Sequence, residues 1–152
     1  MKINIKRAIN APADALWAYL ADYENIHRFH PLIKSEGSHY LEGSKTNELG
    51  SLRQCNFTDG HHIKEKLIDW KDGSHYTVDI YDSTMPMKAA KATLGGKALG
   101  ENKSEAFMKM EITPKYKIMQ PMMYLMFRYR NGPMILKGLE DIYKKEHQLK
   151  VA

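Results

Sequence analysis

The chain has 152 residues, a length that fits one domain and supports one hydrophobic core without disulfides or metals. Hydrophobic residues make up 43 % and charged residues 27 %, which excludes disordered, collagen-like and disulfide-scaffold proteins. The formal net charge of +5 permits attraction to anionic surfaces and by itself assigns no partner.

The cellular compartment is suggested by the cysteine and the N-terminus. The single cysteine, Cys55, cannot form an intramolecular disulfide, and the N-terminal residues alternate in polarity instead of resembling a signal peptide. We therefore expect a cytoplasmic protein. The longest apolar run, residues 122–127, is too short to cross a bilayer, so no stable membrane insertion is expected.

The N-terminal third predicts one strand and two short helices. Alternation over residues 2–10 is typical of a half-buried strand. Pro12 suits the first turn of a helix, which is predicted over residues 13–20. After a break near Asp22, a second short helix is expected to reach about His30.

Residues 32–113 predict a run of six strands. Apolar and charged residues alternate most clearly over residues 105–112, which is typical of a sheet with one dry face and one wet face. Spacings of about ten to fifteen residues between turn signals favour antiparallel hairpins. These signals are Glu42-Gly43, Asp59-Gly60, Asp72-Gly73, Met85-Pro86 and Gly100 with Glu101-Asn102.

A helical period follows Pro114 and continues to about Tyr143. Asn131-Gly132-Pro133 interrupts it, so a kink or a break is expected there. This long helix must bury its apolar stripe, and the dry face of the sheet is the large apolar surface available to it. The fold class is therefore α+β, with the order strand, two short helices, six strands and one long helix.

Four segments carry a family resemblance. Residues 9–17 match the pattern I-x-A-P-x-x-x-x-W, and residues 22–31 contain an aspartate followed by His30-Pro31. Residues 50–53 match G-x-x-R, and Gly60 precedes Glu65-Lys66-Leu67. In this order the chain resembles the START-like or Bet v 1-like superfamily (SRPBCC), which includes polyketide cyclase-like, lipid-transfer and plant hormone-receptor proteins.

The resemblance implies a single helix-grip domain over residues 1–152. A curved antiparallel sheet of about seven strands would wrap around the long C-terminal helix, with a cavity between them. Such a fold hosts many functions, so it fixes shape more than chemistry. A pocket at that place is the default hypothesis for the site.

Methionines are the first candidates for the cavity wall. Four of them recur at i, i+3, i+4 and i+7 at the start of the last helix, and two lie on one face of the facing strand. Flexible methionine side chains suit adaptable apolar ligands, although the same stripe also fits ordinary core packing. The six residues are Met119, Met122, Met123, Met126, Met108 and Met110.

Arg53 and Glu65 are the polar candidates. If Asp59-Gly60 forms a hairpin, they lie on neighbouring strands, and Arg53 shares a face with Cys55 and Phe57. Two buried charges would satisfy each other or the polar end of a ligand. A structural ion pair is the alternative. Tyr76 and Val78, on one face of a later strand, complete the predicted lining.

Other motifs assign no further chemistry. His61-His62 point to opposite faces of a strand, and no cysteine or carboxylate completes a metal set around His27 and His30. We expect no metal and no cofactor. Lys34 is expected to be a solvated strand residue. Gly95-Gly96 is expected in a loop between strands and is not a phosphate-binding loop. Scattered basic residues without a recognition motif argue against nucleic acid.

These observations predict binding of a small hydrophobic molecule that is lipid-, polyketide- or quinone-like, with transport of that molecule as a further expectation. The first alternative is a cyclase or dehydratase, with Glu65 as the acid–base group and Arg53 stabilising an oxyanion. The second is a protein-interaction module with a filled core. Transient contact with anionic lipid is compatible with a basic C-terminal face formed by Lys144, Lys145, His147 and Lys150.

Overall fold

The computed structural model describes residues 1–45 and 48–151. Seven antiparallel strands form one sheet in the order β1-β7-β6-β5-β4-β3-β2. The strands are β1 (Lys2–Ile9), β2 (Ile33–Tyr40), β3 (Leu52–Phe57), β4 (His62–Lys71), β5 (His75–Ser83), β6 (Met87–Gly100) and β7 (Lys103–Pro114). The helical elements are α1 (Ala13–Ala21), the 3-10 helices η1 (Tyr23–Arg28) and η2 (Lys117–Met119), α2 (Gln120–Met126), the π-helical segment η3 (Phe127–Asn131) and α3 (Gly132–Val151).

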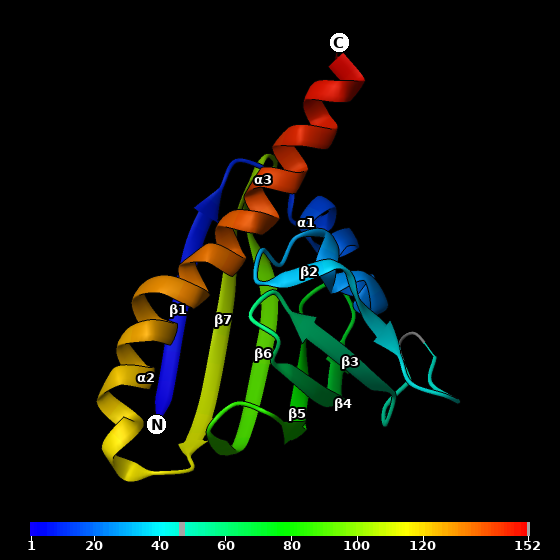
Figure 1. Ribbon diagram of the computed structural model, residues 1–152. Coiled ribbons are helices and arrows are strands. Elements are labelled where there is room, and N and C mark those ends of the chain that lie inside the picture. The colour runs from blue at the N-terminus through cyan, green and yellow to red at the C-terminus, as the bar shows by residue number, and fades with distance from the viewer. Residues whose placement is uncertain (46–47, 152) are drawn as a thin grey trace.

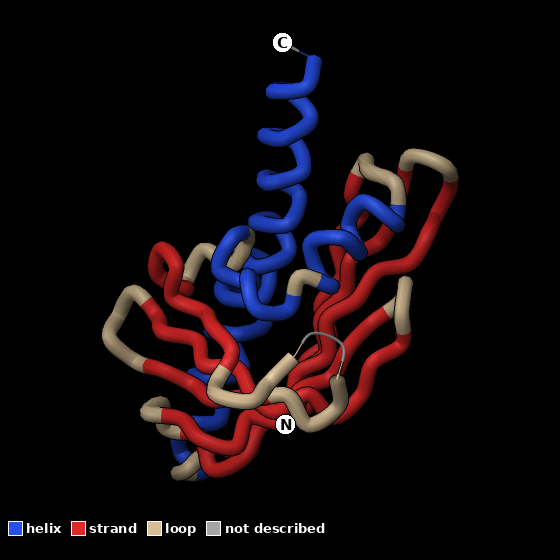
Figure 2. The backbone as a smooth tube through the Cα atoms, turned by 90° about the vertical axis from the view of Figure 1, so that its right-hand side faces the viewer, coloured by secondary structure: helices blue, strands red, loops and turns tan. Residues whose placement is uncertain are grey.

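The sheet curves around the C-terminal helical elements, as predicted (Figure 1). All six neighbouring pairs are antiparallel, which confirms the hairpins inferred from the turn signals. The C-terminal part of α3 extends beyond the sheet (Figure 2). This is the α+β helix-grip architecture, with α1 and η1 as the two short helices between β1 and β2.

The C-terminal helix continues through the point where a kink or break was predicted. Residues 127–131 form a π-helical segment, and α3 begins directly at Gly132. Pro133 has no N–H to donate, and a π segment is one way in which a helix absorbs such a local irregularity. A side chain at Gly132 would place its Cβ only 1.8 Å from Ile5 Cδ1 of β1. Glycine therefore lets the helix approach the sheet closely here.

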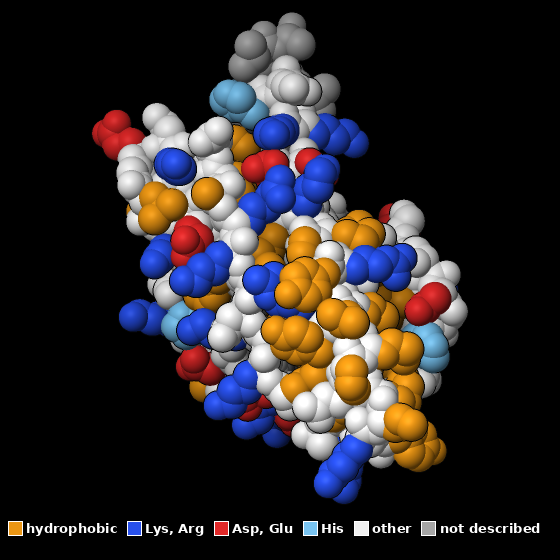
Figure 3. Space-filling model, turned by 90° about the vertical axis from the view of Figure 1, so that its left-hand side faces the viewer, with side chains coloured by type: hydrophobic (Ala, Val, Ile, Leu, Met, Phe, Trp, Pro, Cys, Tyr) orange, Lys and Arg blue, Asp and Glu red, His pale blue; other side chains and the backbone are white. Residues whose placement is uncertain are grey.

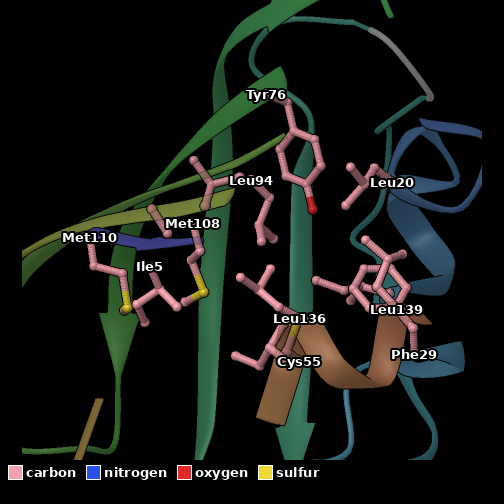
Figure 4. Packing of buried hydrophobic residues seen from close by; sticks show 14 of the residues in the cluster. Ile5, Leu20, Phe29, Cys55, Tyr76, Leu94, Met108, Met110, Leu136 and Leu139 are labelled. Atoms are coloured by element: carbon pink, nitrogen blue, oxygen red, sulfur yellow. The ribbon is translucent and has the colours of Figure 1, made fainter. Parts of the chain in front are cut away.

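The core lies between the sheet and the helices. Met108 and Met110 of β7 lie beside Ile5 of β1, while Leu136 and Leu139 of α3 project into the same interior (Figure 4). Ala106, Met108, Met110 and Ile112 of β7 are buried, as their alternation with charged residues predicted. One expectation was wrong: Gly95-Gly96 lies within β6 instead of a loop, because β6 and β7 form longer strands than the sequence suggested.

No helix among the described residues is long and apolar enough to cross a membrane.

Candidate functional site: a cavity between the sheet and the C-terminal helix

A largely apolar cavity lies between the inner face of the sheet and the C-terminal helical elements. It measures about 80 Å³, counted as the space open to the centre of a water-sized sphere, and one water needs only ~10–15 Å³ on this measure. Its wall is formed by Ile26, His30, Leu32, Ile33, Arg53, Cys55, Phe57, Ile63, Glu65, Val78, Ile80, Met85, Met87, Ala92, Leu94, Met108, Met110, Phe127, Asn131 and Ile135.

Arg53 and Glu65 form the polar corner of the cavity. They lie on the neighbouring strands β3 and β4, as expected of a hairpin at Asp59-Gly60, and are direct cross-strand partners. Arg53 Nε and Nη2 donate to Glu65 Oε1 at 3.0 and 2.7 Å. Arg53 Nη1 donates to the backbone carbonyl of Tyr23 at 2.8 Å. Cys55 Sγ donates to Glu65 Oε1 at 3.1 Å, so one carboxylate oxygen accepts all three side-chain bonds.

Burial governs the electrostatics of this corner. Arg53 is 1 % exposed and Glu65 5 %. Burial is the largest single effect and opposes the charge on Arg53. The attraction of Glu65, together with smaller contributions from Tyr76, Cys55 and Tyr23, outweighs it and raises the pKa of Arg53 well above its usual value. Burial and the Glu65 charge raise the pKa of the Cys55 thiol well above its usual value. Cys55 is therefore a neutral donor and a poor nucleophile here.

Two buried tyrosines flank the guanidinium. Arg53 Cζ lies 3.9 Å from the ring centroid of Tyr23 and 5.8 Å from that of Tyr76. The Tyr76 hydroxyl points into the core between Leu94 and Leu20 (Figure 4). The Tyr23 hydroxyl is buried without a hydrogen-bond partner among the described residues. Burial raises the pKa of both tyrosines, so both hydroxyls stay protonated at neutral pH.

His30 is a further titratable group in the cavity wall. Its Nδ1 accepts a hydrogen bond from the Leu32 backbone N–H at 3.3 Å, and its ring contacts Phe57 edge-on, with the centroids 5.9 Å apart. Burial and the positive charge of Arg53 lower the pKa of His30 to about 3. The ring is therefore neutral at physiological pH, and an accepting Nδ1 leaves Nε2 as the protonated nitrogen.

The structure brings seven of the twelve predicted lining residues into the cavity wall: Arg53, Cys55, Phe57, Glu65, Val78, Met108 and Met110. Tyr76 is buried behind the wall, against Tyr23 and Trp70. Val78 and Tyr76 share a face of β5, but the cavity extends along this face only as far as Val78.

The helix methionines lie elsewhere. Met122 is 59 % exposed, so the expectation that it faces the cavity was wrong. Met123 is buried, and Met119 and Met126 pack partly against the core. The cavity wall, as far as the described residues form it, includes none of the four. The four methionines lie N-terminal to the part of the helix that lines the cavity. That part contributes Phe127, Asn131 and Ile135 to the wall.

Several wall residues were not assigned from sequence. Phe127, Asn131 and Ile135 recur at i, i+4 and i+8, a spacing that places them on one helix face and was available as a signal. The Asn131 Oδ1 atom is buried without a partner among the described residues. Met85 and Met87 flank the β5–β6 turn, and no periodicity marks such turn residues.

Of the remaining candidates, Lys34 is exposed as expected. Within residues 1–45 and 48–151, no group of three or more His, Cys, Asp or Glu side chains is placed to hold a metal ion. The Lys150 side chain, part of the predicted basic C-terminal face, lies outside the described residues.

A curved antiparallel sheet gripping a C-terminal helix, with a cavity between them, defines a START-like helix-grip protein. The chain belongs to the polyketide cyclase / dehydrase and lipid transport family, whose model matches residues 1–145. No curated protein sequence matches the chain significantly.

Solved structures share the fold over nearly the whole chain. The protein XoxI from Bacillus cereus is 21 % identical with a TM-score of 0.79, covering 96 % of this chain and 97 % of its own. A START superfamily protein from Mycobacterium smegmatis is 11 % identical with a TM-score of 0.78, covering 95 % and 97 %. The Zhui aromatase/cyclase from a Streptomyces species is 11 % identical with a TM-score of 0.80, covering 95 % and 94 %. These identities establish the fold alone.

Proposed function

We propose that the protein reversibly binds a small hydrophobic molecule in the cavity between the sheet and the C-terminal helix. The observation that carries this proposal is the cavity itself. Protein interiors are normally packed as densely as organic crystals, and this one leaves an apolar space in its middle. The same observation argues against an interaction module with a filled core. Burial of ligand surface would supply the affinity, at ~25 cal/mol per Å² before binding costs.

The methionines of the wall support an adaptable ligand site. Met85, Met87, Met108 and Met110 approach the cavity from three different strands or turns. Unbranched thioether side chains change rotamer at low cost, so the cavity can enlarge when a ligand enters. This supports lipid-, polyketide- or quinone-like ligands of varying shape.

The polar corner narrows the ligand class. Glu65 Oε1 already accepts the bonds from Arg53 and Cys55, whereas Oε2 accepts none from the described residues. A buried carboxylate oxygen gains most from a donor. We therefore infer a ligand that presents a hydroxyl or amine to Glu65 Oε2. A ligand ending in a carboxylate would meet repulsion at this oxygen.

The cyclase alternative uses the same residues. Glu65 would move a proton and Arg53 would stabilise an enolate-like oxyanion. Three N–H bonds of Arg53 are directed at Glu65 and the Tyr23 carbonyl, which favours a positioning role for the guanidinium and hence binding over turnover. The family description covers both kinds of protein.

Native mass spectrometry of the purified protein, followed by organic extraction, tests whether a hydrophobic compound is retained. Titration with the neutral fluorophore N-phenyl-1-naphthylamine then measures the cavity directly. Ala92 lies in the wall, so Ala92→Phe should weaken probe binding by about tenfold or more. Ala89→Phe, an exposed site on the same strand, is the matched control. Equal probe affinity in both variants would refute the cavity site.

The enzyme alternative is separated by incubating the extracted compound with fresh protein. Conversion to a new mass that disappears in Glu65→Gln would establish catalysis. Retention of the compound without conversion, together with weaker retention in Glu65→Gln, is the result expected of a binding protein whose ligand donates to Glu65.

A further inference from the structure

The start of the C-terminal helix carries a second apolar face that points away from the core. Ile118 is 90 % exposed, and Met122, Leu125 and Tyr129 follow it at i+4, i+7 and i+11, which is one side of a helix. On the opposite side Met123 and Phe127 are buried. A helix that is apolar on both sides is normally covered on both sides. We call the exposed residues the outer apolar face: Tyr116, Ile118, Met122, Tyr124, Leu125 and Tyr129.

The charges around this face are all positive along the chain. Between Glu111 and Glu140 the sequence contains no acidic residue. The same stretch contains Lys115, Lys117, Arg128, Arg130 and Lys137. Figure 3 shows hydrophobic side chains gathered on this side of the molecule, with lysine and arginine side chains on several sides of them and an acidic side chain beside a histidine at the right-hand edge. The surface is therefore apolar at its centre and mainly cationic at its border.

We propose that the outer apolar face docks on the surface of an anionic lipid bilayer. Helices that combine an apolar face with lysine and arginine lie in the bilayer interface, with the apolar side chains among the acyl chains and the cations near lipid phosphates. Tyr116, Tyr124 and Tyr129 suit this position because tyrosine is enriched at the membrane–water interface. The positive border fits anionic headgroups.

Charge complementarity favours a bilayer over a second copy of the chain. A two-fold dimer would place the same patch of both copies face to face, and here that would oppose two cationic borders. Anionic lipid neutralises the border instead. The docking site also differs from the basic C-terminal face around Lys144 and Lys145, where no comparable group of exposed apolar residues accompanies the charges among the described residues.

The docking face adjoins the cavity. The same helical segment contributes Phe127 and Asn131 to the cavity wall, and the Lys115 backbone N–H donates to the Pro86 carbonyl, between wall residues Met85 and Met87, at 3.0 Å. Docking would thus bring the cavity end of the helix to the bilayer, which gives an apolar ligand a route between them. This consequence rests on the proposed ligand binding, whereas the docking itself does not.

Vesicle flotation tests the docking with the full chain. Vesicles of phosphatidylcholine alone are compared with vesicles of phosphatidylcholine and phosphatidylserine. We expect binding to the anionic vesicles to be stronger by roughly 25-fold or more, because each interfacial cation contributes roughly fivefold and at least two cations border the face. Ile118→Asn/Leu125→Asn and Lys117→Glu/Arg130→Glu should each reduce that binding by about tenfold or more. All four side chains are exposed, so circular dichroism should show unchanged folding.

Two variants serve as controls. Leu99→Asn removes an exposed leucine from β6, and Lys145→Glu reverses a charge on the basic C-terminal face; both should retain vesicle binding. Equal binding to neutral and anionic vesicles, or undiminished binding by the two double variants, would overturn the proposal. Sedimentation that reveals a dimer abolished by Ile118→Asn/Leu125→Asn, without vesicle binding, would reassign the face to self-association. N-phenyl-1-naphthylamine binding in solution should be unchanged in all these variants, which keeps this test independent of the cavity.

Discussion

Arg53 and Glu65 face each other directly across β3 and β4, and two N–H groups of the guanidinium donate to the same carboxylate oxygen, Glu65 Oε1. This leaves the other oxygen, Glu65 Oε2, without a donor among the described residues. The geometry joins two roles in one pair. Oε1 holds the buried arginine in place, and Oε2 is the oxygen to which we propose that a ligand donates.

Removing one partner of this pair should destabilise the protein strongly. Glu65→Leu leaves the Arg53 charge buried without its counter-ion, which typically costs about 3–5 kcal/mol. The double variant Arg53→Met/Glu65→Leu should cost much less than either single change, because no charge remains buried. Urea unfolding of the three variants measures this. The exposed pair Lys137–Asp141 is the control, and Asp141→Ala should change stability by less than about 0.5 kcal/mol. Additive single-variant costs would contradict the pairing.

His30 should make stability depend on pH below neutrality. Its pKa of about 3 in the fold lies below the ordinary 6.5, so the unfolded chain binds a proton that the folded chain excludes. The contribution of the neutral His30 to the free energy of unfolding is fully present above pH 6.5. It falls by up to about 1.4 kcal/mol per pH unit as the pH drops toward 3.

Comparison of wild type with His30→Gln isolates the histidine from other titrating groups. The stability difference between the two proteins should shift with pH over this window, and the His30 ring proton in NMR spectra should show no titration near pH 6.5. A normal titration near 6.5 would mean that the ring is solvated and charged, contrary to its place in the cavity wall.

Cys55 should report on access to the cavity. Burial and Glu65 raise the pKa of its thiol, so the reactive thiolate is scarce in the folded protein. At pH 8, the reaction with Ellman's reagent should be at least about a hundredfold slower than in urea, because it requires opening of the fold. A retained apolar ligand should slow the reaction with a small neutral thiol reagent further, since Cys55 lines the cavity. Reaction at the unfolded rate would contradict this.

The fold was predictable because strong local signals agreed along the chain. Asp59-Gly60 and Asp72-Gly73 mark tight turns, and both glycines adopt positive φ. Strand alternation through Arg53, Cys55 and Phe57 survived into the structure because β3 pairs with β4 without a register shift. Where glycine sits inside a long strand, as at Gly95-Gly96, the local signal misled.

The site was less predictable because it depends on where the cavity stops. Periodicity places Met123 on the inner side of the helix, and Met123 is indeed buried, but it cannot show that the cavity begins one turn later at Phe127. Met122 points outward because it lies on the side of the helix that carries Ile118 and Leu125, away from the buried Met123 and Phe127. Both sides are apolar, so the pattern of apolar residues does not show which side faces outward. Which of two apolar faces meets the sheet is set by tertiary packing, for which the sequence carries no separate signal.

The closeness of α3 to the segment after η1 gives a last prediction. A Cβ at Gly138 would lie 2.0 Å from the Phe29 carbonyl oxygen and 3.2 Å from Pro31 Cδ. Gly138→Ala would raise helix propensity by about 1 kcal/mol, yet we expect a net loss of about 1–3 kcal/mol because a backbone oxygen must move. Thermal and urea unfolding measure the change, with the exposed neighbour Lys137→Ala as control. If Gly138→Ala were as stable as that control, α3 would not pack against Phe29 as closely as described, and the position of His30 next to it would need revision.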